Sequence, residues 1–213
     1  MDDPAAPDIQ HLELPKEVPV MVLDGCYLFP GCFLPLFIFE DRYRKMLAHA
    51  LDGPRMFCVG SRLPSEGQTE RVHHISTVGL IRASVKQDDG TSHVMLYGLQ
   101  RVRFTGWKQE APFRIATIDA ETTAEGEDPQ RLAAQRAEAI ELLPAPTAQC
   151  AESMRVLRET LDEIDDPERV CDILSYHFVR TDSALCGLLS EKSVEGRYRI
   201  LLKELAKLRK MAG

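Results

Sequence analysis

The chain has 213 residues, of which 44% are hydrophobic, and its formal net charge is -7. This length and apolar content can bury a substantial core, which excludes a disordered protein. The acidic balance provides no overall attraction for phosphate backbones and argues against nucleic acid as the main partner. The amino terminus has no basic segment followed by an apolar one, and no apolar run is long enough to cross a bilayer. We therefore expect a cytoplasmic protein with no membrane partner.

The first half of the sequence has the patterns of β-structure around a single helix. Strands are expected at 18–23, 34–39, 56–60, 75–86, 92–104 and 115–118. The run at 34–39 is apolar without alternation, which predicts a strand covered on both faces, and Pro35 indicates a sheet edge or a bulge. Residues 40–52 are expected to form an amphipathic helix, because apolar side chains recur there at helical spacing.

Three glycines mark turns or bends in this half. Phe29-Pro30-Gly31 has the pattern of a type II turn, in which Gly31 takes a positive φ. Asp89-Gly90 has the pattern of a hairpin turn between the strands at 75–86 and 92–104. Gly98 indicates a bulge or a close backbone approach, which would bend its strand as closing a small barrel requires.

Beyond residue 120 the apolar period changes from two to about 3.6, which predicts helices. The segment AETTAEGED at 120–128 has no large apolar residue and is the best candidate for a linker. Asp128-Pro129 and Asp166-Pro167 are helix starts, since each places a capping carboxylate before a proline at the first helical position. We therefore predict an α+β protein with a β-rich lobe at 13–120 and a helical bundle at 128–211.

Three stretches resemble one known family. FPGCFLPLFIFEDRYRKML, at 29–47, resembles the LFPG…LPLxIFExRYxxM signature of the substrate-binding N-terminal domain of Lon-type proteases, which also occurs as a free-standing bacterial protein. GLQRVRF at 98–104 and LCGLLSEKSVEGRYRILLKEL at 185–205 are similar to weaker signatures of that family. The resemblance implies a PUA-like β-barrel or sheet lobe with one long helix, followed by an all-α lobe. It also implies a non-catalytic module that engages exposed hydrophobic polypeptide segments or a partner protein.

The candidate polypeptide-binding residues are Phe33, Leu36, Phe37 and Tyr43. The stretch around them supplies more apolar side chains than one short strand of a small barrel can hide, so some are expected to line a groove. Core packing is the alternative for each aromatic. At Phe37 the sequence departs from the family signature, where a polar residue is expected. We expect the groove at the edge of the strand that bears Pro35, with the helical lobe as its other wall.

No catalytic residue, metal or cofactor is expected. The sequence has no G-x-x-x-x-G-K-[ST] loop for phosphates, and it ends at Gly213 without room for a Ser-Lys peptidase domain. The six cysteines form no CxxC pair. His73 and His74 precede a strand, where neighbouring side chains point to opposite faces, which argues against a shared metal. We expect neither ATP hydrolysis nor peptide cleavage.

Two alternatives remain open at this point, because a fold does not imply a function. One is a small-molecule sensor on the same fold. The other is an RNA-binding protein or a hydrolase of unknown type. For RNA, Arg101 and Arg103 fall on one strand face and, with Phe104 and Trp107, would form a basic and aromatic surface. The partner's identity and the oligomeric state are left open by the sequence.

Overall fold

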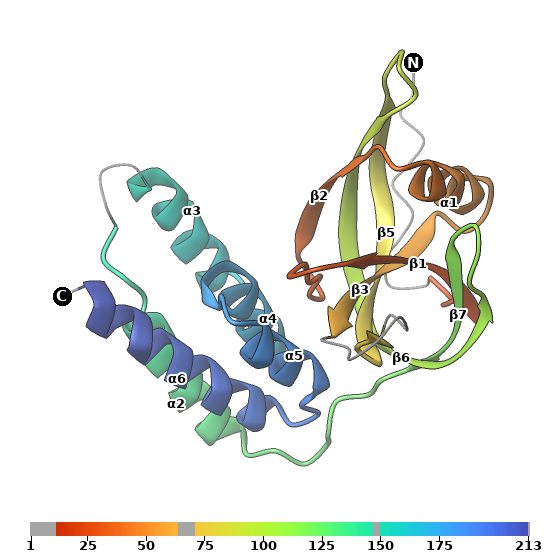
Figure 1. Ribbon diagram of the computed structural model, residues 1–213. Helices are drawn as coiled ribbons and strands as arrows, with labels where there is room; N and C mark the ends of the chain where they lie inside the picture. Colours follow the sequence, from red (N-terminus) through yellow and green to blue (C-terminus); the bar gives the residue numbers. More distant parts are fainter. Residues whose placement is uncertain (1–11, 64–70, 147–149, 213) are drawn as a thin grey trace.

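The computed structural model describes residues 12–63, 71–146 and 150–212 (Figure 1). Strands and a single helix occupy the chain up to residue 120, and only helices follow in the described part beyond it. The α+β prediction is therefore confirmed. In Figure 1 the β-rich lobe and the helical lobe lie side by side, and the loop between β7 and α2 runs along one end of both.

Most boundaries in the first half lie within three residues of the predicted ones, but β6 extends five residues further and β4 was not predicted. The strands are β1 (Glu17–Leu23), β2 (Phe33–Ile38), β3 (Met56–Leu63), β4 (Arg71–Val72), β5 (Ile75–Lys86), β6 (Ser92–Gln109) and β7 (Arg114–Ala120). The helices are α1 (Asp41–Asp52), α2 (Pro129–Glu141), α3 (Ala151–Asp162), α4 (Pro167–Phe178), α5 (Asp182–Ser190) and α6 (Val194–Ala212). None of the described helices has both the length and the apolar composition of a membrane span.

Five strands close into a barrel. Their order is β1-β7-β6-β5-β3, and a parallel pairing between β1 and β3 completes the circle. The long strand β6 pairs with β5 on one side. On its other side the first part of β6 pairs with β2 and the second part with β7. Strand β2 therefore lies outside the closed barrel, and among the described strands it pairs with β6 alone. The edge position predicted from Pro35 is confirmed.

The burial of β2 differs from the expectation of a strand covered on both faces. Leu34, Leu36 and Ile38 are buried, whereas the residues between them are exposed. The buried set packs against α1 and the barrel in one core. No described layer covers the second face, because β2 is an edge strand on the outside of the barrel.

The predicted turns are confirmed, and Gly98 explains how the loop between β1 and β2 is held. Gly31 and Gly90 have φ values of 74° and 82°. The N–H of Gly31 donates to the carbonyl of Gly98 at 2.9 Å, and the N–H of Gly98 donates to the carbonyl of Cys32 at 2.9 Å. A Cβ at position 98 would lie 2.1 Å from the carbonyl oxygen of Phe29. The backbone of this loop therefore lies directly on β6.

The two lobes share a core. The side chains of Asp128 and Asp166 cap α2 and α4 as predicted. The buried cluster of the helical lobe also contains Tyr27 and Phe29, from the loop between β1 and β2, and Ile75 from the start of β5. The division into domains at 13–120 and 128–211 stays a prediction, because this apolar cluster crosses the boundary between them.

Candidate functional site

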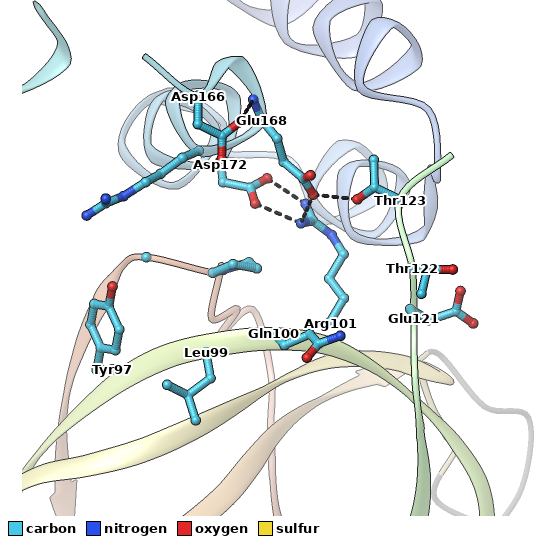
Figure 2. A pocket seen from close by; sticks show the side chains of 13 residues that line it. Tyr97, Leu99, Gln100, Arg101, Glu121, Thr122, Thr123, Asp166, Glu168 and Asp172 are labelled. Carbon is cyan, nitrogen blue, oxygen red and sulfur yellow. Dashed lines mark hydrogen bonds and ion pairs between the residues drawn. The ribbon is translucent and has the colours of Figure 1, made fainter. Parts of the chain in front are cut away.

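A buried ion pair joins the lobes, as Figure 2 shows. Arg101, on β6, donates from Nη1 to Oδ2 of Asp172 at 2.7 Å and from Nη2 to Oδ1 at 2.5 Å. The two side chains are only 5% and 2% exposed. A bidentate pair of this kind is geometrically specific. Because both side chains are buried, water cannot take the place of either partner. The contact therefore sets the position of α4 relative to the barrel.

Glu168 extends this contact to the loop that joins the lobes. Its carboxylate accepts from the hydroxyl of Thr123 at 2.7 Å, lies 3.5 Å from the guanidinium of Arg101, and pairs with Arg197. Burial by itself raises the pKa of Glu168, but the hydrogen bonds from Thr123 and Arg197 outweigh that effect and lower the pKa. Glu168 is therefore charged and held in place at neutral pH.

This arrangement corrects the basic surface considered for RNA. Arg101 is buried against α4, because the helical lobe covers the strand face that carries it. Arg103 pairs with Glu121, whose carboxylate also lies 2.9 Å from Lys192. Both arginines thus pair with acidic side chains of this chain, and Arg101 is too deeply buried to take part in the basic and aromatic surface considered for RNA.

An apolar groove of about 700 Å³ lies between the lobes, next to the ion pair. Its barrel side consists of the turn before β2, the start of β2 and one residue of β6, namely Gly31, Cys32, Phe33 and Tyr97. The residues of α3 and α4 that line the opposite side include Met154, Val156, Leu157, Ile173, Tyr176 and Phe178. Phe33 and Val156 are 52% and 48% exposed, so each lobe presents a large apolar side chain to solvent here.

The groove follows the outer edge of β2 at Phe33. The carbonyl of Cys32 accepts from Gly98 on the β6 side, so the carbonyl of the next residue faces the outer edge. There the hydroxyl of Tyr176 donates to the Phe33 carbonyl at 2.8 Å. The Phe33 ring packs on Tyr97, with centroids 4.9 Å apart. A side chain from α4 thus fixes the floor of the groove.

The structure places the four predicted site residues in three environments. Phe33 lines the groove. Phe37 is also exposed, at 48%, but lies on a separate shallow surface over β5 and β6, where its ring centroid is 4.9 Å from that of His93. Leu36 and Tyr43 are 9% and 3% exposed. Of the four candidate residues, Phe33 alone lines this groove, and the polypeptide-binding role of the four stays a prediction.

The different environments of these residues have a simple physical basis. Leu36 lies on the inner face of β2, opposite to its exposed neighbours Pro35 and Phe37, and packs into the core. Tyr43 occupies the buried face of α1, and its hydroxyl donates to the carbonyl of Val22 at 2.8 Å. Phe37 shares a face with Phe33, but the helical wall of the groove does not extend to it.

The sequence predicted the helical lobe as the second wall of the groove, but it did not identify the residues of that wall. The apolar stripe of α3, which contains Met154 and Leu157, has the spacing of a helix packed against other helices and so does not by itself indicate a groove. A usable signal was Val156, since it is apolar yet lies off that stripe. Tyr176 gave no local signal, because its role depends on a carbonyl 143 positions away.

The paired histidines form a contact between the lobes. His73 and His74 stack with ring centroids 5.0 Å apart, contrary to the expected opposite orientation, because both lie in the loop before β5 and strand alternation does not apply. His73 Nε2 is 3.3 Å from the hydroxyl of Ser190, which itself donates to the carbonyl of Cys186. Within the described ranges no group of three or more His, Cys, Asp or Glu is placed to hold a metal ion.

Comparisons with known proteins agree on one family. The model of the ATP-dependent protease La (LON) substrate-binding domain matches residues 17–207. A Lon protease of Flavobacterium johnsoniae is 29% identical over 114 residues, which are 52% of this chain and 14% of that protein. Lon protease 2 of Bdellovibrio bacteriovorus is 25% identical over 178 residues, which are 79% of this chain and 22% of that protein. The chain thus spans less than a quarter of the length of either relative.

Two solved structures share the fold. The N-terminal domain of the Mycobacterium avium complex Lon protease matches with a TM-score of 0.71 and 18% identity, over 90% of this chain and 98% of that chain. A Lon N-terminal domain protein from Xanthomonas campestris matches with a TM-score of 0.59 and 17% identity, over 88% and 97% of the two chains. At these identities the likeness shows a common arrangement of barrel and helices.

Proposed function

The chain belongs to the family of Lon substrate-binding domains, and on that basis we propose that it is a non-catalytic module that binds exposed apolar polypeptide segments. The observation that carries this proposal is the groove between the lobes, where Phe33 and Val156 are both half exposed. Contiguous apolar surface that remains open to water marks interaction sites. In this proposal the client is an unfolded or partner polypeptide of the cytoplasm.

Side-chain burial, more than backbone pairing, supplies the affinity in this proposal. Covering the exposed half of a phenylalanine contributes about 1 kcal/mol. The outer edge of β2 offers an incomplete ladder to an added strand, since Pro35 has no N–H and the Phe33 carbonyl is already used by Tyr176. A groove that selects on apolar character binds each segment weakly, with a dissociation constant of about 1 μM or higher.

The proposal also holds that the protein does not catalyse a reaction on its client. The comparisons match this chain to the substrate-binding domain, and the sequence carries no phosphate-binding loop. Ser190 donates its hydroxyl hydrogen to the Cys186 carbonyl at 2.8 Å, so that hydrogen is not directed to His73 Nε2, 3.3 Å away, as activation of a nucleophile requires. Purified protein should leave ATP and casein intact. Turnover that a point substitution within this chain abolishes would contradict this part of the proposal.

The experiment for binding compares two matched substitutions on β2. Phe33→Asp places a charge in the groove, whereas Phe37→Asp places the same charge on the same strand face outside it, at nearly equal exposure. Binding of dye-labelled, unfolded casein is measured by fluorescence anisotropy. Phe33→Asp should weaken binding about fivefold or more, which corresponds to the loss of about 1 kcal/mol. Val156→Asp should do the same from the helical wall.

Both β2 variants should keep a thermal midpoint within a few degrees of the unchanged protein, because exposed positions contribute little to the core. Equal binding by the Phe33→Asp variant and the unchanged protein would exclude the groove. A loss confined to Phe37→Asp would move the site to the shallow surface over β5 and β6.

A further inference from the structure

Arg169 stands where the apolar groove meets the polar region around the Arg101–Asp172 pair. It lines both spaces, together with Gly31 and Tyr97. Its side chain lies along the turn before β2, since a Cβ on Gly31 would be 3.5 Å from its Nε atom. Arg169 is exposed, and no residue of the described chain forms an ion pair or hydrogen bond with its guanidinium.

The carboxylates near Arg169 already have partners. Asp172 is held by Arg101, and Glu168 by Arg101 and Arg197. The side chain of Asp166 accepts from the backbone N–H of Glu168 at 2.9 Å and caps α4. Each of these acids is therefore engaged away from the Arg169 guanidinium.

The groove itself has an unbalanced positive charge. None of its described lining residues is acidic. Its other basic residue is His177, whose pKa is lowered by burial and by Arg180, so the imidazole is neutral at pH 7. Arg169 is thus the one formal charge among the described lining residues, in a chain whose net charge is -7.

The position of Arg169 in its helix points the same way. It is the third residue of α4, in the first turn. The partial positive charge of a helix N-terminus disfavours a cation there and favours an anion. A carboxylate bound beside Arg169 would therefore interact favourably with both the guanidinium and the helix.

We propose that the groove binds an apolar polypeptide segment that carries an aspartate or glutamate side chain at one end, and that this carboxylate pairs with Arg169. This inference rests on the proposed polypeptide-binding function. An internal acidic residue fits better than a chain terminus, because the space continues past Arg169 into a polar pocket of about 490 Å³. That pocket is lined in part by Gln100, Thr122 and Thr123, so a bound chain has room to continue with polar residues.

The test uses dye-labelled synthetic peptides with an apolar segment, one variable position and a polar tail that ends in an amide. The variable residue is Glu or Gln. At low salt the Glu peptide should bind the unchanged protein about two- to fivefold more tightly, the range expected for a partly exposed charge pair. Arg169→Gln should abolish that preference, and Arg169→Lys should retain part of it. Arg155→Gln, on the neighbouring helix α3 but outside the groove, should leave it unchanged.

The outcomes separate this inference from the function on which it rests. Equal affinity of the unchanged protein for the Glu and Gln peptides overturns the role of the carboxylate. In that case the groove remains the binding site if Phe33→Asp weakens the binding of both peptides. If Phe33→Asp weakens neither, the proposed function itself fails. If a peptide without the tail, whose free terminal carboxylate lies at the variable position, binds more tightly than the Glu peptide, the internal source is overturned. Arg169→Gln should not lower the thermal midpoint, because a cation in the first turn of α4 is unfavourable beside the positive end of the helix dipole.

Discussion

Arg101 and Asp172 are 71 positions apart in the sequence, yet they form the buried bidentate contact on which the groove depends. Asp172 lies on α4 one turn from Arg169 and one turn from Tyr176, both of which line the groove. The ion pair therefore fixes the position of α4 relative to the edge of β2. A change in this pair would alter the groove without touching its lining.

Replacing Arg101 by Met should lower the free energy of unfolding by about 3–5 kcal/mol, because it leaves the Asp172 carboxylate buried without a partner. Urea denaturation measures the change. The double variant Arg101→Met with Asp172→Leu should lose clearly less than the sum of its two single changes. As a control, Arg155→Met removes an arginine from exposed ion pairs and should have little effect. If Arg101→Met and Arg155→Met lower the free energy of unfolding equally, the structural role of the buried pair is refuted.

Replacing Tyr176 by Phe should lower the free energy of unfolding by about 1 kcal/mol, since it removes the hydroxyl that donates to the Phe33 carbonyl. Tyr97→Phe is the matched control. It lines the same groove, but its hydroxyl has no hydrogen-bond partner among the described residues. Chemical denaturation of the two variants side by side gives the comparison. If both behave alike, the contact between Tyr176 and β2 contributes nothing to stability.

Replacing Gly98 by Ala should destabilise the protein by about 3 kcal/mol or more, because the added methyl group would lie 2.1 Å from the Phe29 carbonyl oxygen and must displace backbone. Gly106→Ala, on the same strand, is a control because a Cβ there meets nothing within 4 Å. That change should be neutral or slightly stabilising. Thermal and urea unfolding test both. A Gly98→Ala variant as stable as Gly106→Ala would contradict the close approach of the loop to β6.

Glu127 should make stability depend on pH through its contacts with the start of α6. Its carboxylate accepts from the Ser193 hydroxyl at 2.6 Å and from the N–H groups of Val194 and Glu195 at 3.0 Å. Burial by itself raises the pKa of Glu127, but these hydrogen bonds outweigh it and lower the pKa. A lowered folded-state pKa contributes stability above the ordinary value, about 4.3, and that contribution is lost as the pH falls through the folded-state value.

Glu127→Gln should therefore cost about 1 kcal/mol at pH 7. The difference from the unchanged protein should shrink as the pH falls below about 4.3. Urea denaturation at a series of pH values measures both. Glu125→Gln, at an exposed position in the same linker, should show neither effect. A pH-independent loss in Glu127→Gln would mean that the carboxylate's charge does not matter there.

Local chemistry was sufficient to predict most of the fold. Gly31 and Gly90 take the positive φ that their turn patterns require, and Asp128 and Asp166 cap the helices that their prolines begin. Each of these signals acts within a few residues, so no knowledge of the tertiary structure was needed to interpret it. The change of apolar period beyond residue 120 separated strands from helices for the same reason.

The site depended on contacts between residues far apart in the sequence. The sequence of β2 does not show that only one face of the strand is covered. In the structure Phe33 and Phe37 lie on the uncovered face, whereas Leu36 lies in the core. The aromatic character of Tyr43 suited a groove or a core equally well, and the packing of α1 on the barrel decided for the core.

From the sequence alone follow the elements, the two-part α+β organisation and the family signature, because turns, caps and apolar periods are properties of short segments. The tertiary structure alone decided that Arg101 meets Asp172 in place of facing solvent, and that Val156 and Tyr176 face the edge of β2. A groove between lobes consists of surfaces that two distant segments leave uncovered. Its position is therefore set by how those segments pack, which neither segment specifies by itself.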